Sequence, residues 1–182
     1  SWSALYATAS EVAPRGLPDG LDIGVTDIAI LINNATNADG TKGPKLAWGT
    51  VSQFTNVPDV FDAGTDLKVS GTLTLNAFDF VNLRASFDLQ LVSGVTAQLD
   101  QDAALENAEL MLLGLTLVDP LFVGQPGGVG ISVGSGNVAV ALLSAVPDAG
   151  APLAPTIIPS ATAITAKLGT ATITGLPEAI DF

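Results

Sequence analysis

The sequence contains neither cysteine nor histidine. Without cysteine the chain has no disulfide, no thiol nucleophile and no thiolate metal ligand. Without histidine it lacks the usual general base and the commonest zinc ligand. Lys68 and Ser70 could form a Ser–Lys pair, but they alternate with apolar residues along one segment and are expected to face solvent. Paired carboxylates for sugar hydrolysis are not indicated either, because the acids fall mostly in turns. We therefore expect no enzyme.

Basic residues are also scarce, with 6 Lys and Arg against 18 Asp and Glu and a net charge of −12. Binding of nucleic acid requires clustered Lys and Arg, so nucleic acid is not an expected partner. No apolar run reaches the roughly 18 residues of a membrane-spanning helix, so no membrane span is expected. An acidic, lysine-poor chain without cysteine fits a secreted or cell-surface protein, and we expect a bacterial extracellular location.

Apolar and polar residues alternate through much of the chain. The segments LKVSGTLTLNA (67–77) and LRASFDLQL (83–91) each place their aliphatic residues on one face, which predicts half-buried strands. Several such segments exceed the usual five or six residues, and nine to eleven strands are expected. The predicted fold is all-β: an elongated antiparallel β-sandwich or a stacked β-sheet repeat module with long strands and at most one short helix.

Three local features interrupt this pattern. The apolar phase of residues 21–33 reverses between Thr26 and Asp27, which predicts a β-bulge. Residues 100–115 have a helix-friendly composition, so a short helix or turn is expected near 101–107, followed by a strand. Residues 146–160 hold 4 of the 11 prolines and are the best candidate for an extended linker.

The chain ends much as it begins. Residues 162–182 align without a gap to residues 3–23, an offset of 159, and 6 of 21 positions are identical. The identical pairs are Ala4/Ala163, Ala7/Ala166, Gly16/Gly175, Leu17/Leu176, Pro18/Pro177 and Asp22/Asp181. The apolar phase also slips at the same place in both copies, before Val12 and before Ala171. We infer one β-rich repeat unit over 1–160, with 161–182 the start of the next repeat or a strand shared with a neighbouring subunit.

The motifs SWSALYATAS, GLPDGLDIGVTDIAILIN and VSGTLTLNAFDF carry a resemblance. They resemble the tandem-repeat modules of very large secreted bacterial surface or matrix proteins of adhesin-like character. In those modules an SW-x-AL-x-A-x-A strand precedes a strand that ends in IN, and an SG-x-L-x-L strand follows. The resemblance implies a structural role outside the cell, in an adhesin-like filament or biofilm matrix. The proline-rich segment 146–160 departs from the pattern.

Calcium is the one ligand that the sequence suggests. NNATNADG (33–40) resembles the first half of an EF-hand loop without its glutamate, and PDVFDAGTD (58–66) gathers aspartates. The candidate ligands are Asn34, Asn37, Asp39, Asp59, Asp62 and Asp66. Ordinary solvated Asx turns are the favoured interpretation of the same residues. No other cofactor is expected.

Three functions remain open at this point. The first is a structural module of an extracellular bacterial fibre that assembles head-to-tail with copies of itself, through β-strand pairing or strand exchange. The second is a β-groove that binds lipid or another apolar ligand along its long apolar strand faces. The third is an adhesin domain that calcium makes rigid.

Overall fold

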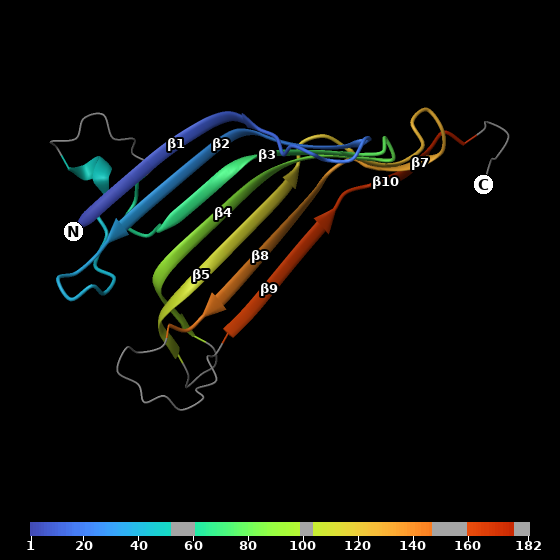
Figure 1. Ribbon diagram of the computed structural model, residues 1–182. Coiled ribbons are helices and arrows are strands. Elements are labelled where there is room, and N and C mark those ends of the chain that lie inside the picture. Colours follow the sequence, from blue (N-terminus) through green and yellow to red (C-terminus); the bar gives the residue numbers. More distant parts are fainter. Residues whose placement is uncertain (52–60, 99–103, 147–159, 177–182) are drawn as a thin grey trace.

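The computed structural model describes residues 1–51, 61–98, 104–146 and 160–176, and these residues form one antiparallel sheet of ten strands (Figure 1). The strands are β1 (Trp2–Val12), β2 (Leu21–Ala35), β3 (Leu67–Ala77), β4 (Val81–Gln98), β5 (Ala104–Leu117), β6 (Leu121–Gly124), β7 (Gly130–Val133), β8 (Gly136–Ser144), β9 (Ser160–Leu168) and β10 (Ala171–Thr174). The only helical turn in the described residues is η1 (Trp48–Thr50). The all-β antiparallel prediction is confirmed. The described residues make a single sheet, not the two packed sheets of a sandwich.

The sheet order is β1-β2-β3-β4-β5-β8-β9, and β6, β7 and β10 continue the sheet at one end. There β6 pairs with β4, β7 with β6, and β10 with β7. Three consecutive pairs of strands therefore each make one long strand with a short break: β5 with β6, β7 with β8, and β9 with β10. The sheet has a long panel (β5, β8, β9, most of β1 and the adjoining parts of β2 to β4) and a short panel (β6, β7, β10 and the remaining parts of β1 to β4).

The breaks line up across the sheet and form a fold line between the two panels. On β2 the register shifts between Thr26 and Ala29, and Asp27 has a positive φ of 53°, so the predicted β-bulge is confirmed. After β5, the N–H groups of Val118 and Asp119 both donate to the Arg84 carbonyl, which marks a second irregularity. Bulges increase local twist and bend a strand, and Figure 1 shows the short panel turned nearly edge-on relative to the long panel.

The helix or turn expected near 101–107 is wrong for 104–107, which already belong to β5, the strand expected to follow. Ala104 and Leu105 pair with β4, and Asn107 has a positive φ of 57° in a bulged part of β5. Cross-strand pairing with β4 has outweighed the helix-friendly composition, as tertiary context commonly does. Residues 101–103, and 147–159 of the proposed linker, lie outside the described residues.

The buried core of the described residues is small. The buried hydrophobic side chains are Leu31, Ala35, Phe61, Ala85 and Ala108. Leu31 and Phe61 lie on one face of the long panel, where residues 36–51 and 61–66 cover the ends of β2 and β3. The fully buried Asn33 joins this segment to β2: its side-chain amide donates to the carbonyls of Leu46 and Asp62 at 2.9 and 2.7 Å, and its Oδ1 accepts from Trp48 Nε1 at 3.0 Å.

Candidate functional site

One face of the sheet is apolar on every strand, and we call it the apolar face. Its first row, ordered from β1 to β8, is Leu5, Ile32, Leu67, Leu91, Met111 and Leu142. The second row, from β1 to β9, is Ala7, Ile30, Val69, Leu89, Leu113, Val140 and Ile164. Nearer the fold line follow Ala9, Ile28, Phe87, Leu115, Val138, Ala166 and Leu168. The short panel adds Val12, Leu21, Ile23, Val25, Leu73, Leu75, Val81, Leu83, Leu121, Val123, Ile131, Val133, Ala171 and Ile173.

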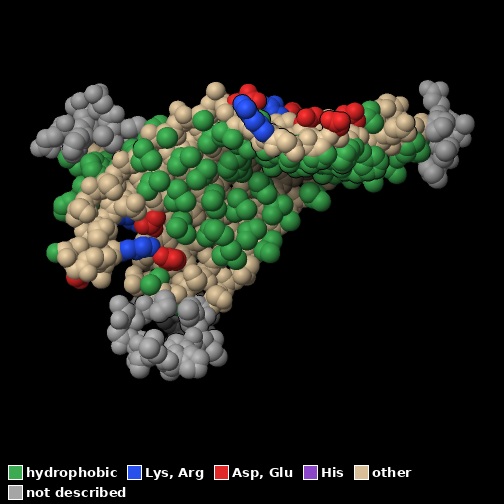
Figure 2. Space-filling view, viewed as in Figure 1, with side chains coloured by type: hydrophobic (Ala, Val, Ile, Leu, Met, Phe, Trp, Pro, Cys, Tyr) green, Lys and Arg blue, Asp and Glu red, His purple; other side chains and the backbone are tan. Residues whose placement is uncertain are grey.

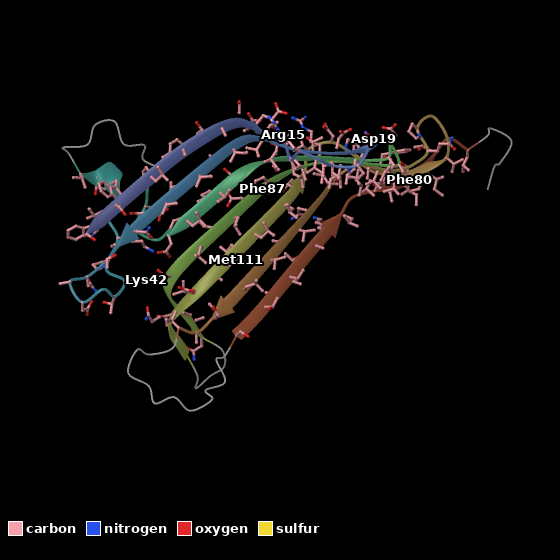
Figure 3. The ribbon with its side chains drawn as sticks, in the orientation of Figure 1. Arg15, Asp19, Lys42, Phe80, Phe87 and Met111 are labelled. Atoms are coloured by element: carbon pink, nitrogen blue, oxygen red, sulfur yellow. The ribbon has the colours of Figure 1, made fainter. Side chains whose placement is uncertain are left out.

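No described strand or loop covers the apolar face. Figure 2 shows hydrophobic side chains running across the long panel and along the underside of the short one, and Figure 3 places Phe87 and Met111 on it from neighbouring strands. At the edge the exposure is large, 68% for Ile164 and 66% for Leu168. A contiguous apolar surface of this extent exceeds what soluble monomers normally expose and indicates an interaction surface.

The two faces differ in charge. No charged side chain of the described residues lies within the apolar rows. The row that follows Leu91 and Met111 is polar, Ser93, Glu109, Ser144 and Ser160, and forms a margin. The opposite, polar face carries ion pairs such as Lys68–Asp88 and Arg84–Asp119.

An apolar hollow lies where the two panels meet, and we call it the corner. Its volume is about 230 Å³. The lining side chains come from both sides of the fold line, among them Leu73, Leu83 and Leu121 from the short panel and Leu115 and Leu168 from the long panel. Since these side chains all belong to the apolar face, this face is the inner side of the bend.

The two outer strands are matched in sequence and geometry. Among the described residues β1 pairs only with β2, and β9 only with β8. All residues of both strands are exposed. The equivalent residues Leu5 and Ile164 both lie on the apolar face, and the equivalent Gly16 and Gly175 both have positive φ, 78° and 75°. The structure therefore gives residues 3–9 and 162–168 the same extended conformation and the same face, and Gly16 and Gly175 the same backbone region.

The calcium candidates are distributed over three places. Asn34 lies on β2, and Asp39 lies in the following turn, where its Oδ1 accepts from the N–H and Oγ1 of Thr41 at 2.9 and 2.6 Å. The bond from the Thr41 side chain is the main cause that lowers the pKa of Asp39 below its ordinary value. Asp62 Oδ1 accepts from the N–H groups of Gly64 and Thr65 at 2.6 and 2.8 Å.

The remaining candidates do not complete a site in the described residues. Asn37 donates through Nδ2 to Thr41 Oγ1 and to the Lys42 carbonyl, Asp66 is held by Lys45, and Asp59 lies outside the described residues. No group of three or more acidic residues in the described part of the chain is close enough to hold a metal ion. Calcium binding stays a prediction.

Asp66 and Lys45 form an ion pair that the sequence did not reveal. Lys45 Nζ is 2.9 Å from Asp66 Oδ1, and their side chains are 8% and 12% exposed. The Ser93 N–H and Oγ donate to the same carboxylate at 2.5 and 3.0 Å. Burial raises the pKa of Asp66, but the bonds from Lys45 and Ser93 and the Lys45 charge outweigh it and leave the pKa below its ordinary value. Lys45 and Asp66 both belong to the residues that cover the ends of β2 and β3 (36–51 and 61–66, the covering segment), so the pair joins the two parts of this segment, and the bonds from Ser93 join it to β4.

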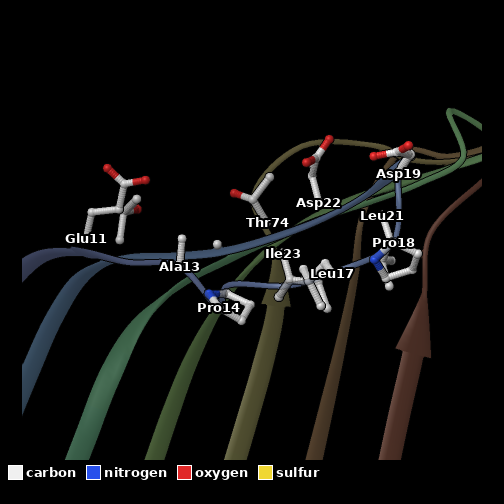
Figure 4. Close-up of a pocket in the computed structure, with 13 residues that line it drawn as sticks. Glu11, Ala13, Pro14, Leu17, Pro18, Asp19, Leu21, Asp22, Ile23 and Thr74 are labelled. Carbon is white, nitrogen blue, oxygen red and sulfur yellow. The ribbon is translucent and has the colours of Figure 1, made fainter.

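A second hollow, of about 620 Å³, lies along the connection from β1 to β2 (Figure 4). The side chains of Glu11, Asp19 and Asp22 project from the same side of the ribbon. Pro14 and Leu17 also line this hollow, which is wide and open. It brings no acid–base pair or metal-ligand set together in the described residues.

No protein-family model matches the chain, and no curated protein or solved structure matches it either. Within the described residues, no helix has the length and apolar character needed to cross a membrane. The candidate site therefore rests on the geometry of the apolar face, the corner and the two outer strands.

Proposed function

We propose that this chain is a structural module of an extracellular bacterial fibre or surface repeat protein, in which units join head-to-tail through their sheet edges. One observation carries the proposal: β9 repeats β1 in sequence, in face and in direction. Six strands, β1, β2, β3, β4, β5 and β8, precede β9 across the sheet, and every neighbouring pair is antiparallel. An even number of antiparallel steps gives β9 the direction of β1.

The outer edge of β9, which pairs with no described strand, has the same orientation as the edge of β1 that pairs with β2. Both strands run the same way and turn the equivalent side chains Leu5 and Ile164 to the apolar face. β2 lies on one side of β1, whereas β8 lies on the other side of β9. The open side of β9 is therefore equivalent to the side of β1 that pairs with β2. An open strand edge templates pairing with another strand, and here the matching strand is the β2 of the next unit.

The register of this contact follows from the offset of 159 residues. Leu5 pairs with Ile32, so its equivalent, Ile164, is expected to face Ile32 of the next unit. In a longer tandem chain β9 would itself be the first strand of that unit. Between separate copies β9 would replace β1. Repetition of this contact by the same operation gives an open head-to-tail array, not a closed ring.

Cysteine cross-linking tests this register directly, because the chain has no cysteine of its own. The double variant Ile32→Cys/Ile164→Cys is oxidised and run on a non-reducing gel. We expect a ladder of covalent multimers that dithiothreitol collapses. An intrachain bond cannot account for it, because β2 and β9 lie five strand spacings apart, about 24 Å.

Two matched variants make the result specific. Leu5→Cys/Ile32→Cys joins strands that are already paired within one chain and should give only monomers. Ile28→Cys/Ile164→Cys is displaced by four residues, about 13 Å along the strand, and should give no ladder. If all three variants give the same gel, or if Ile32→Cys/Ile164→Cys stays monomeric at high concentration, the proposed edge pairing is wrong.

A further inference from the structure

We propose that the corner binds the hydrocarbon chain of a single lipid molecule. Its lining includes Leu168 of the outer strand β9, but the site lies on the apolar face and does not depend on the proposed assembly. Its lining comes from Leu73, Leu83, Leu115, Leu121 and Leu168, side chains that meet only because the sheet bends at the fold line. The backbone groups around it are already used in strand pairing, so the surface offers no hydrogen-bonding demand that a polar ligand would meet.

The chemistry of the apolar face selects an uncharged apolar occupant. No charged side chain of the described residues lies within its rows, although the chain as a whole carries a net charge of −12. Apolar cavities of roughly 150 Å³ already take up small hydrocarbons, and the corner has about 230 Å³. The second row continues the apolar surface away from the corner across seven strands. A chain of many methylenes can therefore extend beyond the hollow and bury further methylenes on this row, each of which adds to the affinity.

The shape of the face favours a slender flexible chain over a second copy of the protein. The apolar face is the inner side of the bend, and a second copy would present the same concave surface. Two concave faces leave their corners unfilled, and unfilled apolar hollows lose the dispersion contacts that close packing gives. A hydrocarbon chain can enter the corner and follow the bend. A polar row, Ser93, Glu109, Ser144 and Ser160, bounds the face where a lipid headgroup would return to water.

Site-specific quenching tests the proposal. The single variants Leu168→Cys, in the corner, and Thr165→Cys, on the polar face of the same strand, are labelled with bimane. Each is titrated with 16-doxyl-stearic acid below its micelle concentration. We expect saturable quenching at position 168 that unlabelled palmitate reverses, and only weak, non-saturating quenching at position 165. Both positions are exposed on an edge strand, so neither label is expected to prevent folding; circular dichroism checks this.

A charge variant provides a second, label-free measurement. Leu168→Asp should weaken palmitate binding, measured by calorimetry, by about tenfold, because a carboxylate in the corner must be desolvated. Thr165→Asp adds the same charge on the other face and should leave the affinity unchanged. Equal quenching at both positions would overturn the proposal. So would a lipid-free sample in which the label at 168, but not the label at 165, becomes shielded as the protein self-associates, because a second copy would then cover the apolar face, whereas pairing at the β9 edge would affect both positions alike. Neither measurement depends on the cross-linked ladder, so this site and the proposed function can fail separately.

Discussion

The Lys45–Asp66 ion pair offers a quantitative test of how the two parts of the covering segment are held together and, through Ser93, to β4. Asp66→Asn keeps the shape of the side chain and an oxygen that can accept from Ser93, but it leaves the Lys45 ammonium, whose side chain is 8% exposed, without its counter-charge. Removal of one partner from a buried pair commonly costs 3–5 kcal/mol. Because both side chains keep some contact with water, we expect the lower end of that range, about 3 kcal/mol. For a chain of this size the cost corresponds to a decrease of roughly 6–12 °C in Tm.

Urea unfolding at several pH values gives the sign as well as the size of the effect. The pKa of Asp66 in the folded protein is below its ordinary value of 3.8, so its contribution is fully present above that value and is lost as the pH falls through the folded pKa. The difference between the wild type and Asp66→Asn should therefore be constant near neutral pH and shrink below about pH 4. Lys45→Met, combined with Asp66→Asn in a double-mutant cycle, should recover part of the loss. A loss of unfolding free energy under about 1 kcal/mol, or a difference that does not change with pH, would refute the conclusion that this buried ion pair stabilises the fold.

Four further variants probe other parts of the structure. Lys68→Ala removes an ion pair whose side chains are 44% and 49% exposed, and its free energy of unfolding should change by less than about 1 kcal/mol; a larger loss in urea unfolding would contradict this. Asn33→Leu leaves the carbonyls of Leu46 and Asp62 without their donor, so a cost of about 3 kcal/mol is expected in the same assay. Gly16→Ala should cost about 1 kcal/mol for its positive φ alone, because an added Cβ meets no atom within 4 Å. Gly175→Ala should lower Tm more, because its Cβ would collide with the Gly128 carbonyl.

The strands of the sheet and the faces they present could be predicted from local pattern. The alternation in 67–77 and 83–91 assigns Val69 and Leu89 to the apolar face and Lys68 and Asp88 to the other, and the structure places them so. The slip at Thr26 could also be found, because a bulge shifts the apolar phase by one residue. The architecture could not: a strand of an open sheet and a strand of a sandwich show the same alternation, and only the arrangement of distant segments separates them.

The corner and the Lys45–Asp66 ion pair could not be predicted from the sequence, for a related reason. Leu73, Leu115 and Leu168 are ordinary members of three alternating strands, and they meet because the bulge on β2 and the breaks after β5, β7 and β9 fall on one line across the sheet. Lys45 lies in a segment with no alternation, 21 residues before its partner Asp66. A buried polar contact of this kind leaves no periodic signal, since it depends on where a loop lies over the sheet. Lys45 could have been suspected only because basic residues are so few in this chain.

The repeat relation also determines how the apolar face would continue in an assembly. Ile164 belongs to the second row, but its equivalent, Leu5, belongs to the first row. Each row would therefore pass into the next unit with a stagger of two residues, about 7 Å along the strand. The break after β9 at Gly169 is equivalent to Ser10, which lies opposite Asp27 at the fold line of β2. The fold line of one unit would thus meet the fold line of the next, and the corners would join into one apolar trough that crosses the strands.

One lipid chain per unit, bound in such a trough, would leave the strand edges free for assembly, so saturating palmitate should not diminish the cross-linked ladder of Ile32→Cys/Ile164→Cys. A ladder that disappears when palmitate binds would show that the edge and the face compete, and would refute this arrangement of the trough.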